Sequence, residues 1–141
     1  MERLAEFAAN HWVLVLATVG ILAGLIWTFV YPKIQGVRKV TPLEATRMIN
    51  QEDALILDVR GDAEFNQGHI LNSLHIPIRF LSEQAGKLDK HRSRPIIATC
   101  RTGQQSAGVC ATLRKRGFEK VFNLNGGILA WQNANLPLTK K

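Results

Sequence analysis

The most uneven feature of the sequence is a long apolar stretch near the N-terminus. Residues 12–31, WVLVLATVGILAGLIWTFVY, are almost wholly apolar, and residues 7–32 contain no Asp, Glu, Lys or Arg. About 20 such residues let a helix cross the roughly 30 Å hydrocarbon core of a bilayer. Trp12, Trp27 and Tyr31 stand near the two ends, as is typical of side chains at membrane interfaces. We therefore predict one transmembrane helix over residues 12–31.

Two other interpretations of this stretch fit less well. A cleaved signal peptide has a shorter apolar core and small residues at its cleavage site, whereas bulky Val30, Tyr31 and Pro32 stand here. A helix that is apolar on every face also occurs in the core of a large protein, but the rest of this chain is too short to bury one. Gly20 and Gly24 form a GxxxG spacing, which leaves open a homodimer through that helix face.

Basic residues beside the apolar stretch set its expected orientation. Before it the sequence has a single Lys or Arg, which is Arg3. After it come Lys33, Arg38, Lys39 and Arg47. The flank richer in Lys and Arg stays in the cytoplasm. We therefore expect a single-pass membrane protein with residues 1–11 outside, a linker over residues 32–40, and the rest of the chain in the cytoplasm.

Short apolar runs alternate with helical patterns in the rest of the chain. The runs predict strands over residues 54–59, 73–76, 95–99 and 120–124, and the helical patterns cover 42–51, 62–67, 80–88, 104 or 106 to 116, and 128–133. Runs that are apolar throughout are typical of strands buried on both faces. Alternation of strands and helices predicts an α/β fold, a doubly wound parallel sheet flanked by helices. We expect this domain over residues 41–138, followed by a tail of residues 139–141.

Charge and cysteine content narrow the classes of partner. Residues 33–141 hold 17 of the 18 basic and 9 of the 11 acidic residues, a net charge of +8. Such a charge favours approach to anionic lipid headgroups. We expect no nucleic-acid partner, because the sequence lacks interleaved aromatic and basic residues and a helix-turn-helix pattern. We expect no metal site either, because the two cysteines and four histidines show no ligand spacing.

Cys100 is the strongest candidate for chemistry. It directly follows the predicted strand 95–99, and in open parallel sheets ligands bind beyond the carboxyl ends of the strands. The loop residues that follow are Arg101, Thr102, Gly103, Gln104 and Gln105. Backbone N–H groups of such a loop and the next helix favour negative charge, which makes a thiol there more nucleophilic. The alternative is a plain buried cysteine.

Other polar candidates have simpler interpretations. Cys110 shares a helix face with small apolar residues and suits the core, although a resolving thiol for Cys100 is the alternative. Asp58 and Arg60 could act on the loop, but they also suit a structural charge pair at a strand end, because a partly buried carboxylate needs a partner. His69 suits packing in a turn better than the role of a base.

Several motifs together resemble the rhodanese-like domain family. Cys100-Arg101-Thr102-Gly103 resembles its active loop, C-R-x-G-x-x. The other landmarks, in order, are Leu57-Asp58-Val59-Arg60, Glu64-Phe65, Gly68-His69-Ile70, His75-Ile76-Pro77, and Leu124-Asn125-Gly126-Gly127 with Trp131. The resemblance covers about residues 41 to 138. With the apolar helix in front, the layout is similar to that of membrane-anchored single-domain rhodanese-like proteins of the YibN type.

The resemblance implies a sulfurtransferase. A small sulfur-containing anion such as thiosulfate would give its outer sulfur to Cys100, and a protein or small thiol acceptor would take it from the persulfide. Residues 101–105 would bind the anion, and no metal or organic cofactor would be needed. Many family members have Arg at the loop's sixth position, where this chain has Gln105, so the anion site would lack one cation.

Three other function classes follow from the same loop. A membrane-tethered binding or scaffolding module would use the fold without turnover. Redox sensing would use a disulfide between Cys100 and Cys110. Phosphatase chemistry would require an Arg six positions after the cysteine to clamp phosphate. Position 106 is Ser, which excludes the phosphatase interpretation.

Overall fold

The computed structural model describes residues 1–34 and 36–141, and among these it describes no side chain of residues 31–34. The expected interfacial side chain of Tyr31, the flanking side chain of Lys33 and Gln35 of the expected linker lie outside the described residues. The chain divides into two compact units, Met1–Gly36 and Val37–Lys141.

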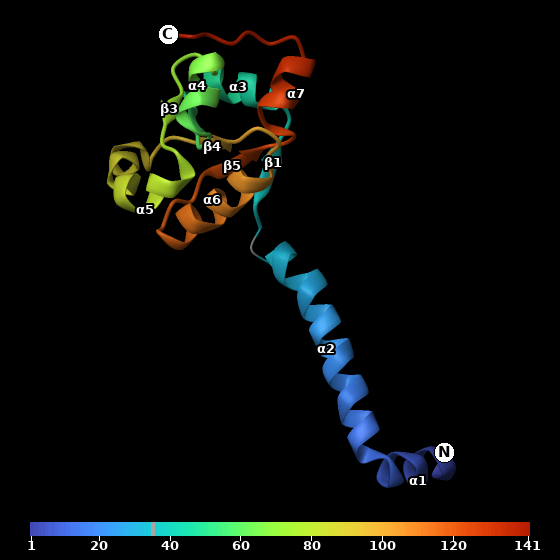
Figure 1. Cartoon of the computed structure of the whole chain (residues 1–141). Helices are drawn as coiled ribbons and strands as arrows, with labels where there is room; N and C mark the ends of the chain where they lie inside the picture. The colour runs from blue at the N-terminus through green and yellow to red at the C-terminus, as the bar shows by residue number, and fades with distance from the viewer. Residues whose placement is uncertain (35) are drawn as a thin grey trace. The chain divides into compact units, whose positions relative to one another are not determined.

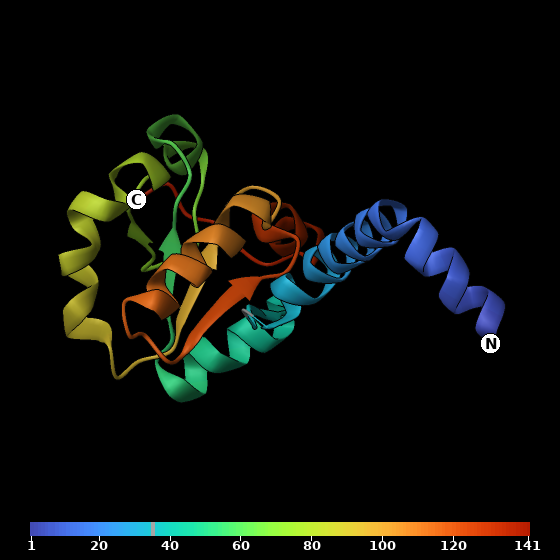
Figure 2. The ribbon, with the colours of Figure 1, turned by 90° about the horizontal axis from the view of Figure 1, so that it is seen from below.

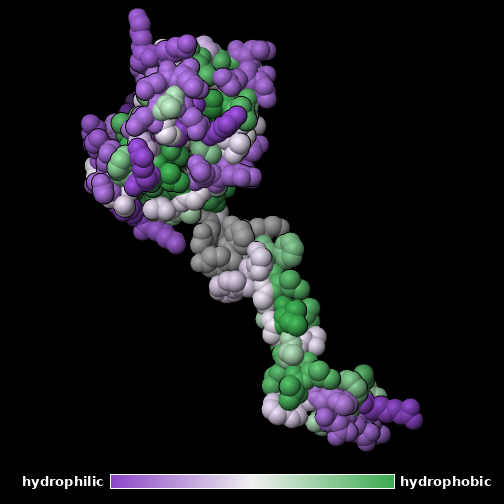
Figure 3. Space-filling view, in the orientation of Figure 1, coloured by the Kyte–Doolittle hydropathy of each residue, from purple (hydrophilic) through white to green (hydrophobic). Residues whose placement is uncertain are grey.

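The N-terminal unit consists of two helices. Helix α1 covers Glu2–Asn10 and α2 covers Trp12–Ile34. Within α2, Trp12–Val30 is long and apolar enough to cross a membrane, and none of it is buried. Figure 3 shows that the visible face of α2 is largely hydrophobic. Helix α1 lies in the segment of residues 1–11, for which no helix was predicted.

The C-terminal unit is built on a parallel sheet of five strands in the order β1-β5-β4-β2-β3 (Figure 1). Its strands are β1 (Arg38–Val40), β2 (Leu55–Asp58), β3 (Leu74–His75), β4 (Ile96–Thr99) and β5 (Val121–Leu124). Four of them match predicted strands. The fifth strand, β1, was not predicted. Residues 38–40 were expected to be part of the linker, but they pair with β5 as an edge strand.

Helices cover both faces of the sheet, which confirms the predicted α/β fold. They are α3 (Pro42–Glu52), α4 (Asp62–Gln67), α5 (Leu81–Gln84), α6 (Gln104–Lys115) and α7 (Gly127–Asn133), with 3-10 turns η1 (Ile78–Phe80) and η2 (Ala85–His91). Buried residues of α5, η2 and α6 form one core on one face, and those of α3 and α7 form a second core on the other. Figure 2 shows the strands between α6 and α3.

Neighbouring residues in the sequence explain where α3 begins and where α5 gives way to the 3-10 turn η2. At the start of α3, the Glu44 N–H donates to Thr41 Oγ1 and the Thr41 N–H donates to Glu44 Oε2, and these two bonds form a capping box. The helix expected over residues 80–88 is α-helical for only four residues before the 3-10 turn, which contains the poor helix former Gly86. At the C-terminus, Thr139 forms an antiparallel bridge with His69, so the expected tail is paired with the domain.

Candidate functional site

Cys100 lies where strand β4 ends and the loop to α6 begins. Gly103 has a φ of +89°, a left-handed conformation that suits glycine, and it caps the N-terminus of α6. The side chain of Cys100 is buried, whereas Arg101, Thr102, Gln104 and Gln105 are exposed. The sulfur is therefore shielded from solvent within a loop whose other side chains are exposed.

Two N–H groups and one hydroxyl face the sulfur atom of Cys100. The Gly103 N–H lies 3.1 Å from Sγ, and the N–H and Oγ of Ser106 each lie 3.4 Å from it. Burial raises the pKa of the Cys100 thiol, but hydrogen bonds from the Ser106 side chain and from the N–H groups of Ser106, Thr102 and Gly103 lower that pKa more, so that it lies below its ordinary value. The loop therefore favours a thiolate at Cys100.

The carbonyl groups of the same loop turn toward helix α7. The Ile128 N–H donates to the Cys100 carbonyl at 2.9 Å, and the Leu129 N–H donates to the Arg101 carbonyl at 3.2 Å. A Cβ atom on Gly127 would lie 2.4 Å from the Cys100 carbonyl oxygen, so only glycine allows this approach. In the sequence, Gly126 and Gly127 are landmarks of the family motif, and the contact of α7 with the loop becomes visible only in the structure.

A buried amide on strand β5 also contacts the loop. Asn123 Nδ2 donates to the Gly103 carbonyl at 2.8 Å, and the Ser106 hydroxyl lies 2.6 Å from Asn123 Oδ1. Neither Asn123 nor Ser106 was a predicted site residue. The available signal was the polar Asn123 among the apolar residues Val121, Phe122 and Leu124, because a buried amide needs hydrogen-bond partners.

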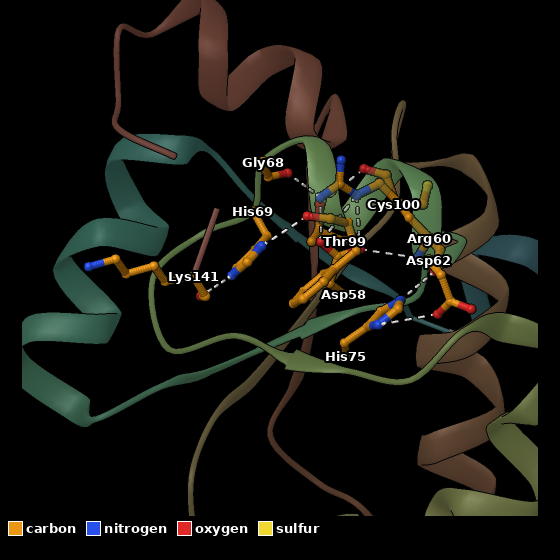
Figure 4. Close-up of polar contacts among 10 residues, drawn as sticks. Asp58, Arg60, Asp62, Gly68, His69, His75, Thr99, Cys100 and Lys141 are labelled. Carbon is orange, nitrogen blue, oxygen red and sulfur yellow. Dashed lines mark hydrogen bonds and ion pairs between the residues drawn. The ribbon is translucent and has the colours of Figure 1, made fainter. Parts of the chain in front are cut away.

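Asp58 and Arg60 form a buried ion pair beside the loop, as Figure 4 shows. Arg60 Nη2 lies 2.7 Å from Asp58 Oδ2 and donates to the Gly68 carbonyl at 2.8 Å, while Arg60 Nε contacts both carboxylate oxygens. These contacts hold the Arg60 guanidinium between the Asp58 carboxylate and the Gly68 carbonyl.

Two clefts flank Arg101, and both are also lined by Arg60 and Glu64. The smaller cleft, of about 230 Å³, extends toward α7. The larger, of about 440 Å³, is lined by Gln105 of the loop and by Arg79 of η1. A small anion in the larger cleft would meet guanidinium groups but no cation at position 105.

Cys110 and His69 lie in structural positions. The Cys110 thiol is fully buried and donates to the Phe122 carbonyl at 3.2 Å, and burial raises the pKa of this thiol to about 12. A thiol that stays protonated is a poor resolving nucleophile. The His69 ring stacks on Phe65 at 3.8 Å, and its nitrogens lie within 2.9 Å of the carbonyls of Phe65 and Lys141.

Comparisons with known proteins agree with this geometry. The family model of the rhodanese-like domain matches residues 41–134. The chain is 33% identical over 141 residues to the uncharacterized protein YibN of Escherichia coli K12, covering 99% of each chain. It is 33% identical over 95 residues to the thiosulfate sulfurtransferase GlpE of Coxiella burnetii, covering 67% of this chain and 87% of GlpE. The crystal structure of a rhodanese-related protein from Thermoplasma volcanium aligns with a TM-score of 0.68 and 28% identity, over 74% of this chain and 99% of that one.

Proposed function

The chain belongs to the rhodanese-like domain family, and from that premise we propose that it is a sulfurtransferase that carries sulfane sulfur as a persulfide on Cys100. The observation that carries this proposal is the convergence of the N–H groups of Gly103 and Ser106 on the Cys100 sulfur at 3.1 and 3.4 Å. These donors favour the thiolate, which is the attacking species in sulfur transfer.

The proposed reaction has two steps. First, the Cys100 thiolate attacks the outer sulfur of a donor such as thiosulfate, the S–S bond of the donor breaks, and sulfite leaves with the electron pair. Second, a thiophilic acceptor attacks the outer sulfur of the persulfide, and the electron pair of the broken S–S bond returns to Cys100 as thiolate. Fixed N–H donors stabilise the negative charge that the sulfur atoms carry in both steps.

The donor is proposed to enter through the larger cleft, which is lined by Arg101 and Gln105 of the loop and by Arg79 of η1. Arg60 also lines this cleft, but its guanidinium is already paired with Asp58. Arg101 is therefore the first cation available to a small sulfur-containing anion, and Arg79 is the second, although its exposed guanidinium lies 3.8 Å from the Asp62 carboxylate. The GlpE relative, which is named a thiosulfate sulfurtransferase, supports thiosulfate as the first donor to test.

For the location of the reaction, we propose that α2 spans a membrane with the N-terminus outside and the domain at the cytoplasmic face. This rests on the length and apolar character of α2 and on the basic residues that follow it. A reporter enzyme that works only in the cytoplasm should be active when it is fused after Lys141. Activity of a reporter that works only outside the cytoplasm would show the opposite orientation. Crosslinking through Gly20→Cys would test a homodimer through the GxxxG face.

The mass of the intact protein tests the sulfurtransferase proposal. The full chain in detergent is incubated with thiosulfate beside Cys100→Ser and, as the matched control, Cys110→Ala. We expect a gain of one sulfur atom on the wild type and Cys110→Ala but not on Cys100→Ser, and we expect cyanide to remove it as thiocyanate. No gain with thiosulfate, mercaptopyruvate or an organic persulfide would favour the alternative, a membrane-tethered binding or scaffolding module.

A further inference from the structure

Ser106 and Asn123 form a buried hydrogen-bonded pair that ends at the reactive sulfur. Both side chains are shielded from solvent, and Ser106 Oγ lies between Asn123 Oδ1 at 2.6 Å and Cys100 Sγ at 3.4 Å. We propose that Asn123 is a positioning residue that holds the Ser106 hydroxyl proton away from Cys100 until negative charge develops on the cysteine sulfur.

The direction of each hydrogen bond follows from the Gly103 carbonyl. A carbonyl oxygen can only accept, so the Asn123 atom that faces it at 2.8 Å must be the amide nitrogen. The amide oxygen then faces Ser106. Because that oxygen can also only accept, the Ser106 hydroxyl must donate its one proton to Asn123 at rest. Only the oxygen lone pairs of Ser106 then face Cys100, and lone pairs favour a neutral S–H group over a thiolate.

Ionisation of Cys100 changes this preference. A hydrogen bond to an anion is about twice as strong as one between neutral groups, so the hydroxyl turns from Asn123 to the thiolate. This rotation leaves the buried Asn123 oxygen without its donor, which has a cost. Asn123 therefore opposes ionisation of the resting thiol, whereas Ser106 stabilises the thiolate once it has formed.

The same pair would act in sulfur transfer, and this part of the inference rests on the proposed function. In the persulfide the inner sulfur of Cys100 is uncharged, so the Ser106 proton stays on Asn123. When an acceptor attacks the outer sulfur and the S–S bond breaks, the electron pair moves to the inner sulfur and the hydroxyl turns toward it. No atom leaves Ser106, and the charge is stabilised where it appears.

Other ionisable groups around the loop are the same in every variant that tests this inference. They are Arg101 in the loop, Asp58 at the end of β2, Arg60 after it, Asp62 and Glu64 on α4, Arg79 on η1, and Cys110 on α6. Helix α7 contributes no ionisable side chain. A difference between variants in the titration of Cys100 therefore reports on Ser106 and Asn123.

The test is the pH dependence of Cys100 alkylation by iodoacetamide, followed by the mass of the full chain in detergent. Asn123→Val should lower the pKa of Cys100 by about 1 pH unit, the order of one hydrogen bond to a charged group, because the freed hydroxyl can donate to the thiolate. Ser106→Ala should raise the pKa. In the double variant, Asn123→Val should have no further effect, because the hydroxyl through which Asn123 acts is gone.

Two results would overturn the inference: a pKa raised by Asn123→Val, or a shift that persists unchanged in the Ser106→Ala background. Either would mean that Asn123 acts by holding the Gly103 carbonyl, since loosening the loop disfavours the thiolate. If Asn123→Val does not fold, Asn123→Ala removes the same acceptor without added bulk. Alkylation uses no sulfur donor, so failure of sulfur transfer and failure of this inference are separate outcomes.

Discussion

Replacing Gly127 with alanine tests whether helix α7 shapes the active loop. The new Cβ atom would lie 2.4 Å from the Cys100 carbonyl oxygen and 2.6 Å from that of Arg101. To restore even a 3.0 Å contact, the Cys100 carbonyl must move by about 0.6 Å. Because that carbonyl and the N–H groups around Sγ belong to one short loop, the movement misaligns the donors that face the sulfur.

Two effects set the expected loss of stability. Gly127 has a φ of +60°, and a left-handed conformation costs a residue with a Cβ atom about 1–2 kcal/mol. Overpacking against backbone atoms adds about 1–3 kcal/mol. The activity should fall further than the folded fraction, because a hydrogen bond to a charged group contributes about 1.5–3 kcal/mol, or roughly 10- to 100-fold in rate.

Gly126→Ala is the matched control. Gly126 also has a positive φ, +77°, but its Cβ would meet the Ala130 side chain, at 2.6 Å, and not the loop. Urea denaturation should therefore show comparable losses of unfolding free energy for the two variants. Sulfur-transfer rates and the alkylation profile of Cys100, measured on folded protein, should change mainly in Gly127→Ala. Equal profiles for Gly127→Ala and wild type would refute the reasoning.

Three further predictions concern single side chains. Asp58→Asn should lower the unfolding free energy by about 3 kcal/mol, because Arg60 is left buried without a counter-charge, whereas Asp89→Asn, in an exposed pair, should cost less than about 1 kcal/mol in the same urea titration. Burial raises the pKa of the Cys110 thiol from 9.0 to about 12 in the folded chain, so as the pH rises this thiol loses its proton first in the unfolded chain. The free energy of unfolding should therefore fall between these two pH values by up to roughly 1.4 kcal/mol per pH unit. Cys110→Ala should show a shallower fall, and an equal slope would mean that Cys110 is not the titrating group. Gln105→Arg should increase kcat/KM for thiosulfate up to about tenfold, with a steeper dependence on salt than the wild type shows; an unchanged value would mean that the donor does not pass this side of the loop.

The parts of the fold that the sequence predicts are those marked by burial. Strands β2 and β4 are buried along their whole length, and such apolar runs are recognisable without a structure. Strand β1 has no such apolar run, because it lies at the edge of the sheet, where Arg38 and Lys39 are exposed and only Val40 is buried. Charged residues are common on edge strands, and here they look the same in sequence as a basic linker.

Some residues of the candidate site are neighbours in the sequence, and others are brought to it only by the fold. Cys100 and residues 101–105 are contiguous, so their chemistry can be inferred from one loop. Asn123 is different, because it reaches the loop through the parallel register of β4 and β5, in which it lies opposite Ala98. An amide inside an apolar run predicts a buried polar partner, but only the packing of α6 against β5 identifies that partner as Ser106. A polar residue in a strand beside a candidate nucleophile is therefore a signal to test for a positioning role, even where the sequence alone does not show what it contacts.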